Sequence, residues 1–193
     1  PKLHKVSIAG LLPDTKYYYQ ISTDGVALSP AGDLNYYFKT APPTGSDTPF
    51  TFAVLGDRDS ATVASAVGAK NPDLTMVVGD LGYPYSSQAE TVTFDGFKNL
   101  NRHSPSYPTC GNHDSGSQCE TMMDEHSLPG SGRAGGTSAY SYDWGNVHFT
   151  TINTNTSVTY NSATPQSSAA QMVWAYNDIR NSSAKWKVLY FHH

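Results

Sequence analysis

Side chains that bind metal ions follow the ends of four short apolar runs in this chain. The runs and the residues that follow them are 50–56 with Asp57, 74–79 with Asp80, 106–111 with Asn112, and 187–191 with His192. Tyr83 comes three residues after Asp80. Carboxylate, amide and phenolate oxygens suit highly charged cations, and a neutral imidazole suits zinc, iron or manganese. The set predicts a metal site, with enough donors for two metal ions.

The elements that must position these side chains are strands. Short apolar runs rich in β-branched and aromatic residues are typical of buried strands. Between the first two runs, residues 60–69 have a helical period with Val63 and Val67 on one face. Strand, helix and strand in that order predict a parallel pair with a right-handed crossover. Ligands bind beyond the carboxyl ends of such strands, so we expect all four strand ends to meet in one shallow bowl.

The rest of the chain after residue 49 alternates in the same way, which predicts the α/β class. We expect helices at 92–100 and 168–179, strands at 138–143 and 146–152, and mostly loop at 115–137.

Residues 1–44 have a different pattern. Short alternating runs at 4–9, 16–22 and 35–40 are separated by turn residues, which predicts a small all-β region. The segment 41–49 is rich in Pro, Gly and small polar residues and is typical of a linker. We therefore place a domain boundary there, with residues 1–44 before it and 45–193 after it.

Charge and hydropathy exclude several classes of partner. The net charge is −4 and there is no basic run, so neither nucleic acid nor an anionic membrane is expected as a partner. No apolar stretch reaches the roughly 18–20 residues that a bilayer crossing needs. The chain begins at Pro1 without a signal-like segment, so we expect that a leader was removed or that the sequence starts inside the protein. The sequence does not indicate an oligomeric state.

Two features favour a secreted or lumenal protein. Cys110 and Cys119 enclose a short loop of Gly, Asn, Asp and Ser, which favours a disulfide over two free thiols. Asn155 and Asn181 each begin an Asn-X-Ser/Thr triplet, the acceptor of N-linked glycans.

The four metal-binding blocks occur in an order that resembles a known family. These blocks are similar to the signature blocks of calcineurin-like metallophosphoesterases. They are Gly56-Asp57 and the segments 79–83, 111–114 and 188–192. Tyr83, the β-rich segment in front and the block 140–149 resemble purple acid phosphatases in particular. The resemblance runs through essentially the whole chain. It implies a truncated metallophosphoesterase α+β sandwich in residues 45–193, preceded by a partial fibronectin type III-like domain in residues 1–44.

The resemblance also implies a chemistry, which is hydrolysis of phosphate monoesters by hydroxide formed on a pair of metals. In such a site Asp57 and Tyr83 hold Fe³⁺, Asn112 and His192 hold a divalent ion (Fe²⁺, Zn²⁺ or Mn²⁺), and Asp80 bridges the two. His113 contacts the substrate phosphate and protonates the departing alkoxide, and Asp114 orients His113. The expected partner is a small phosphorylated substrate.

Some assignments stay open at this point. His192 is chosen over His193 because the family's ligand is the first residue after the apolar run. Asp59 is an outer-sphere carboxylate, a ligand as in sister families, or a residue at a helix N-terminus, and we favour the last. The other histidines, at 4, 103, 126 and 148, are expected on the surface or as satisfied structural groups.

The chain departs from the family pattern at its end. A later Gly-His-x-His block, which gives one histidine to each metal in the family, does not precede the final residue, His193. The polypeptide therefore supplies five metal ligands, and we expect an isolated 1–193 polypeptide to have little phosphatase activity. Two other functions remain open: a phosphodiesterase or nucleotidase on the same fold, and a non-catalytic secreted binding protein with a decayed site. The sequence fixes neither the substrate nor the divalent metal.

Overall fold

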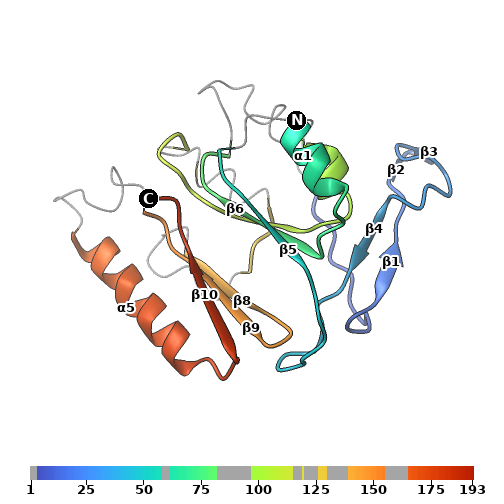
Figure 1. Ribbon diagram of the computed structural model, residues 1–193. Coiled ribbons are helices and arrows are strands. Elements are labelled where there is room, and N and C mark those ends of the chain that lie inside the picture. Colours follow the sequence, from blue (N-terminus) through green and yellow to red (C-terminus); the bar gives the residue numbers. More distant parts are fainter. Residues whose placement is uncertain are drawn as a thin grey trace.

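Two three-stranded sheets pack face to face in this protein, and helices cover their outer faces (Figure 1). The computed structural model describes residues 4–57, 61–81, 97–114, 119, 126–129, 139–154 and 165–193. All statements below concern these residues. Together the sheets and helices form a layered α/β sandwich, as the sequence predicts.

The first sheet is parallel and has the strand order β5-β6-β7. Its strands are β5 (Phe52–Leu55), β6 (Leu74–Val78) and β7 (Ser106–Thr109). Helix α1 (Ala61–Gly68) connects β5 to β6. Because β5 and β6 pair in parallel, the predicted strand–helix–strand unit is confirmed. Residues 97–101 are helical and lead into β7, so the described part of the helix predicted at 92–100 is also confirmed.

The second sheet has the order β10-β9-β8. β8 (Tyr140–Trp144) and β9 (Val147–Thr151) form an antiparallel hairpin, whose turn contains Gly145 at a φ of 58°. Helix α5 (Pro165–Asn181) follows, and β10 (Trp186–Tyr190) then pairs in parallel with β9. These elements agree with the strands and the helix predicted for this part of the chain.

The main core lies between the sheets. Its buried members are Leu74 and Met76 of β6 and, from the second sheet, Trp144, Val147, Phe149 and Tyr190. A second cluster joins β5 to the helices on the outer face of the first sheet, through Leu55, Ala64, Phe97 and Leu100. Apolar burial holds the central strand β6 most firmly, and the carboxyl ends of the strands carry the predicted metal ligands.

The four strand ends that carry predicted ligands do not belong to a single sheet. Three of them end β5, β6 and β7, whereas His192 follows β10 in the second sheet. The physical reason is the β8–β9 hairpin, whose inward side chains face the first sheet and which gives β10 its own pairing partner. The site is therefore built where two packed sheets meet, a feature that strand patterns alone do not indicate.

The N-terminal part contains only short strands. β1 (Lys16–Tyr18) pairs with β4 (Tyr37–Lys39), and β2 (Ser22–Thr23) pairs with β3 (Val26–Ala27). The strand predicted at 4–9 is wrong, since those residues are exposed and irregular. Alternation alone does not make a strand when no described segment pairs with it. The fibronectin type III-like assignment and the division into two domains stay predictions.

The segment 41–49, typical of a linker by composition, is held against the second sheet. The backbone N–H of Gly45 donates to the carbonyl of Gly145 at 2.8 Å. The Asp47 carboxylate accepts hydrogen bonds from Asn146 and Lys185. Long-range contacts of this kind fix a segment that its prolines keep out of any sheet.

Helix α5 is attached to the second sheet by a buried polar cluster around His148, which is 8% exposed. The Nδ1 atom of His148 lies 2.7 Å from Asp143 on β8, and its Nε2 atom lies 2.9 Å from Asp178 on α5. Ser141 and Thr150 each donate to Asp178 at 2.8 Å. His148 is thus a satisfied structural histidine, as predicted.

This cluster makes the stability of the fold depend on pH. Burial by itself lowers the pKa of His148, but hydrogen bonds to Asp143 and Asp178 outweigh it and raise that pKa above its usual value. The stabilisation is fully present below the unfolded-state pKa of about 6.5 and is lost as the pH rises through the folded-state pKa.

We expect His148→Gln to cost about 1.5–3 kcal/mol of unfolding free energy at acidic pH and less at alkaline pH. Urea unfolding of both proteins at a series of pH values measures the difference. A cost that stays constant across the range would contradict the prediction. Lys187, which is paired in register with His148 on β10 and is also charged, provides a control through Lys187→Gln. That variant should show no loss specific to acidic pH.

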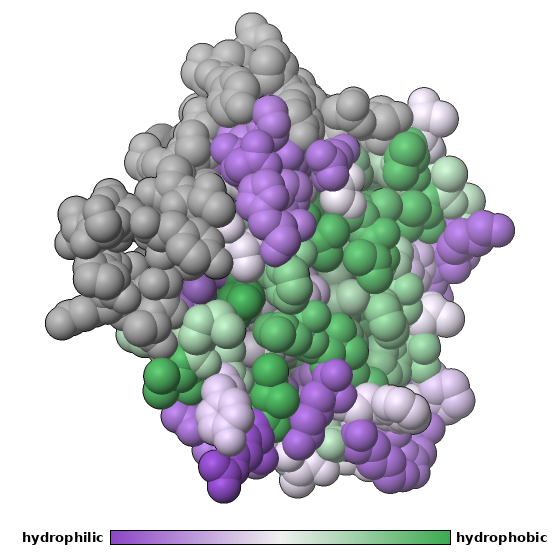
Figure 2. Space-filling view, turned by 60° about the vertical axis from the view of Figure 1, so that its left-hand side comes forward, coloured by the Kyte–Doolittle hydropathy of each residue, from purple (hydrophilic) through white to green (hydrophobic). Residues whose placement is uncertain are grey.

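Apolar side chains are exposed on the edge strands of both sheets. They include Phe52 and Val54 on β5 and Trp186 and Leu189 on β10. Figure 2 shows one face of the molecule with hydrophobic residues gathered near its centre and hydrophilic residues around them.

Within the described residues, no helix has both the length and the apolar character that a membrane span requires.

Candidate metal centre

The ends of β5 and β6 have an unusual backbone. Asp57 and Asp80 adopt φ values of 52° and 53°, in the left-handed region that few residues other than glycine adopt. Gly79, directly before Asp80, has a φ of 84°. The N–H of Asp57 donates to the carbonyl of Gly79 at 3.2 Å, which joins the two strand ends. Strained residues persist where surrounding contacts fix them, and they are frequent at functional sites.

Asp80 is the most enclosed of the predicted ligands, with 1% of its surface exposed. Its Oδ1 atom accepts a hydrogen bond of 2.9 Å from the backbone N–H of His113. Its Oδ2 atom lies 3.6 Å from Nε2 of His192 and 3.9 Å from Nε2 of His113. The carboxylate is therefore surrounded by residues from two other stretches of the chain.

The contacts of His192 fix its tautomer. Its Nδ1 atom lies 2.7 Å from the carbonyl oxygen of Val78, and because a carbonyl can only accept, Nδ1 carries the proton. In the neutral ring Nε2 then presents a lone pair. That atom lies 3.1 Å from Oδ1 of Asn112 and 3.6 Å from Oδ2 of Asp80. Three electron-pair donors thus face one another.

This arrangement fits a metal ion. Ligand atoms that each lie about 2.0–2.2 Å from a metal are about 3–3.5 Å from one another, close to the separations seen here. In metal sites, the second ring nitrogen of a ligating histidine commonly donates a hydrogen bond to a backbone carbonyl, and this bond orients the ring. In the part of the chain that the structure describes, no three His, Cys, Asp or Glu residues are grouped to hold a metal. The present set instead combines one Asp and one His with an amide oxygen.

Two glycines give these side chains their room. A Cβ atom on Gly79 would lie 2.4 Å from Nδ1 of His192, and one on Gly111 would lie 2.1 Å from Oδ1 of Asp80. Real Cβ atoms essentially never approach other atoms this closely. Close packing of Asp80 and His192 therefore requires glycine at both positions.

Asp114 is a buried carboxylate that ties two loops together. Its Oδ1 atom accepts from the N–H of Leu81, and its Oδ2 atom accepts from the N–H of Gly111, both at 2.8 Å. Burial raises the pKa of Asp114 even though these bonds oppose the shift. Asp114 thus fixes the loop after β6 relative to the loop after β7. Its predicted orienting effect on the His113 ring stays a prediction.

The predicted disulfide is present in the structure, with the Cα atoms of Cys110 and Cys119 5.8 Å apart. Both residues are buried, and they pack with Tyr140. Because Cys110 directly follows β7 and lies two residues before Asn112, the disulfide anchors the loop that carries a predicted ligand.

We expect the double variant Cys110→Ala, Cys119→Ala to lose about 2–3 kcal/mol of unfolding free energy, since the closed loop is short. Guanidinium unfolding of the oxidised wild type and the variant measures this loss. Reduced wild type should unfold close to the variant. Equal stability of all three proteins would show that the disulfide does not stabilise the fold.

The structure brings together only some of the predicted site residues. Asp80, Asn112, His113 and His192 converge, and Asp57 lies at the adjoining strand end. The His193 backbone instead donates to Thr154, and its ring packs against His192. Asn181 is exposed at the end of α5. Asp59, Tyr83 and Asn155 lie outside the described residues. The ligand and glycosylation roles stay predictions.

Sequence reasoning missed the carbonyl of Val78, which sets the proton position on His192. Backbone atoms leave no direct signal in a sequence. The indirect signal is Gly79, since a residue without a side chain directly after a strand leaves space for a ring.

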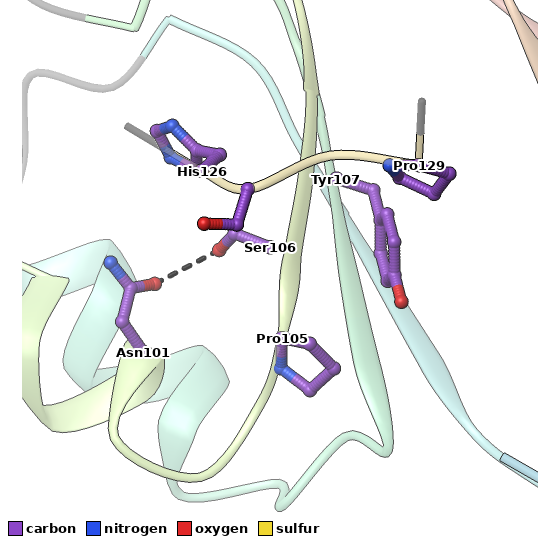
Figure 3. Close-up of a pocket in the computed structure, with 7 residues that line it drawn as sticks. Asn101, Pro105, Ser106, Tyr107, His126 and Pro129 are labelled. Atoms are coloured by element: carbon purple, nitrogen blue, oxygen red, sulfur yellow. Dashed lines mark hydrogen bonds between the residues drawn. The ribbon is translucent and has the colours of Figure 1, made fainter. Parts of the chain in front are cut away.

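A cavity of about 390 Å³ lies away from these residues, beside the start of β7 (Figure 3). Asn101, Pro105, Ser106, Tyr107, His126 and Pro129 line it. Ser106 donates to Asn101 at 2.9 Å, so these two polar side chains already satisfy each other. The cavity adds no donor to the metal centre.

Comparison with known proteins places this geometry in context. No family model matches the chain. Three curated plant proteins are similar to part of it. Purple acid phosphatase 13 of Arabidopsis thaliana is 30% identical over 98 residues, which are 48% of this chain and 17% of that protein. Purple acid phosphatase 23 of the same plant is 33% identical over 95 residues, 47% of this chain and 20% of that protein. The Glycine max purple acid phosphatase is 27% identical over 123 residues, 58% of this chain and 25% of that protein.

Two solved structures share the fold. A purple acid phosphatase from yellow lupin seeds superposes with a TM-score of 0.62 at 18% identity, covering 80% of this chain and 32% of that one. The structure of PhoD superposes with a TM-score of 0.66 at 18% identity, covering 93% of this chain and 48% of that one.

The sandwich of two sheets, with the predicted ligands at the strand ends, has the same fold as these two solved structures. The sequence matches are to purple acid phosphatases, and over the matched part this chain is purple acid phosphatase-like. The chain spans 17–25% of the length of the three curated relatives.

Proposed function

We propose that this chain forms part of a binuclear metallohydrolase that cleaves phosphate monoesters. The observation that carries the proposal is the convergence of Asp80 Oδ2, Asn112 Oδ1 and His192 Nε2, three electron-pair donors without a hydrogen between them. Similarity to purple acid phosphatases supports the reaction class. In this proposal Asp57 and Tyr83 hold Fe³⁺, Asn112 and His192 hold Fe²⁺, Zn²⁺ or Mn²⁺, and Asp80 is shared.

When bound, such a pair of metals lowers the pKa of water and neutralises charge on the phosphoryl group. The chain's own residues supply position and protons. His113 is 30% exposed, and its Nε2 atom lies 3.9 Å from Asp80, so its ring borders the site and is accessible to a substrate. We assign it the donation of a proton to the departing alkoxide. The backbone N–H of His113 fixes Oδ1 of Asp80, and this orients the carboxylate so that both of its oxygens stay in the site.

A secreted or lumenal location is part of the same proposal. The Cys110–Cys119 disulfide supports it, since disulfides persist in oxidising compartments. Asn181 is exposed, so a glycan there would meet no steric obstacle from the described fold. The fibronectin type III-like character of residues 1–44 is proposed with it, on the short paired strands β1 to β4.

Metal binding tests the proposal directly. Titration of the metal-free protein with Zn²⁺ or Mn²⁺ should give saturable binding in the wild type. Asp80→Asn and His192→Ala should each weaken it by more than the about 10–100-fold that loss of a supporting residue costs. With Fe³⁺ bound, a visible absorption band should appear in the wild type and vanish in Tyr83→Phe.

Hydrolysis supplies the second readout. Metal-dependent turnover of p-nitrophenyl phosphate, low but above that of bis-p-nitrophenyl phosphate, supports monoester hydrolysis and should disappear in Asp80→Asn. His193→Ala is the matched control for His192→Ala and should retain metal affinity. Equal metal affinity in the wild type, Asp80→Asn and His192→Ala would overturn the proposal. A preference for the diester would replace the monoester reaction with a phosphodiesterase.

A further inference from the structure

A second cavity, which is polar and of about 310 Å³, lies between the N-terminal strands and the helices that cover the first sheet. Its lining includes Asn35, Tyr37, Asn71, Asn99, Arg102 and His103. Helix α1 runs back from the end of β5 to the start of β6, so the cavity, beside the C-terminal end of α1, is at the opposite end of the sheet from the metal centre. No described residue that lines it carries a carboxylate.

Two buried nitrogen atoms at this cavity have no hydrogen-bond partner among the described residues. They are Nε2 of His103, whose side chain is 8% exposed, and Nε of Arg102. A buried polar group without a partner costs about 1–3 kcal/mol, so native structures seldom retain one without a ligand or water. Both residues line the cavity, which is where a partner can reach them.

Among the described residues, the His103 ring has backbone hydrogen bonds to Gly68 and Asn99, which raise its pKa but do not outweigh burial. The carbonyl groups at the ends of the nearby helices already accept backbone hydrogen bonds. They are those of Ser65, Val67, Gly68, Lys98 and Leu100. The carboxylate of Asp33 accepts from the backbone and side chain of Asn35. The unpaired Nε–H of Arg102 can only donate, and Nε2 of His103 becomes a donor when the ring is protonated.

Positive charge also gathers around the cavity. The Tyr37 ring stacks on His103 with 5.4 Å between centroids, and the ammonium of Lys16 lies 4.0 Å from the centre of that same ring. The guanidinium of Arg102 lies 5.6 Å from the centre of the Tyr36 ring. Cationic donors suit an anionic ligand, and a guanidinium binds paired oxygens especially well.

We propose that this cavity binds a small oxyanion such as phosphate, held by Arg102 and His103. The site is independent of the proposed metal centre. It lies between β4 and the helical layer of the first sheet, because Asn35 and Tyr37 come from one side and Arg102 and His103 from the other. Burial, with the Arg102 charge, lowers the pKa of His103, and a bound anion should raise it again.

Inorganic phosphate added to metal-free protein in EDTA tests the proposal. The ring resonances of His103 should shift with saturation, and the pKa of His103 should rise when phosphate is bound. Arg102→Met, which keeps the stem of the side chain, should weaken phosphate binding by about 10-fold or more, the effect of one lost charged hydrogen bond.

Lys98→Met is the matched control, because Lys98 is on the helix that directly precedes Arg102, is exposed and does not line the cavity. It removes the same charge and should leave phosphate affinity unchanged. Urea unfolding of both variants establishes that they fold. The proposal is overturned if the shift of the His103 resonances does not saturate with phosphate concentration. It is also overturned if both variants weaken phosphate binding equally. Phosphate binding that Asp80→Asn abolishes and Arg102→Met does not would overturn it too.

Discussion

Replacing Gly111 by alanine should destabilise the protein by about 3 kcal/mol or more, as overpacking of a rigid site does. The added Cβ would lie 2.1 Å from Oδ1 of Asp80 and 2.4 Å from its backbone nitrogen. The oxygen could rotate away, but the backbone nitrogen cannot move without shifting the end of β6. We also expect metal affinity to fall, because the loop that carries Asn112 must move away from Asp80.

Gly68→Ala is the control for this substitution. A Cβ there would meet its neighbours at 3.7–3.9 Å, which is ordinary contact, and Gly68 ends helix α1, where alanine is the better helix former. Urea unfolding should therefore show Gly68→Ala at or above the stability of the wild type. Wild-type stability in Gly111→Ala would mean that the two loops are not packed as closely as the structure has them.

The sequence was sufficient to predict the elements that carry the site. Strands β5, β6, β7 and β10 each bury apolar side chains and end next to a metal-binding residue, so their composition indicates both strand and site. The position of His192 after β10 follows from the same pattern. Such features are local, and local patterns are what a sequence shows most directly.

Contacts between distant segments could not be predicted in this way. Asp47 holds its segment through Asn146 and Lys185, which are about a hundred or more residues away along the chain. The proton position on His192 depends on the carbonyl of Val78, and every residue has a carbonyl. The sequence likewise gives no sign that β10 joins a second sheet, since pairing partners depend on the packing of the whole chain.

Asp114 illustrates how such a contact could govern the site. The block that contains it predicts a residue that orients His113, whereas its carboxylate receives N–H groups from Leu81 and Gly111. These two residues adjoin Asp80 and Asn112, the proposed ligands from separate strands. A carboxylate that bonds both loops fixes the distance between them, which is the requirement for a metal shared by the two.

Asp114→Ala should therefore leave two buried N–H groups unpaired and cost about 3–5 kcal/mol of unfolding free energy. Asp114→Asn keeps one acceptor oxygen and should cost less. If Asp114 positions the ligands, Asp114→Asn should also lower Zn²⁺ affinity by about 10–100-fold, the usual cost of losing a supporting contact.

Urea unfolding and Zn²⁺ titration of the same samples separate these two effects. Asp24→Asn is the control, since Asp24 is exposed in the β2–β3 turn at a φ of 48°, a conformation that asparagine tolerates. It removes the same charge and should change neither property. Two ligands held only by their own strands would not respond to this substitution. A folded Asp114→Asn protein with wild-type Zn²⁺ affinity would therefore show that the carboxylate stabilises the loops without positioning the ligands.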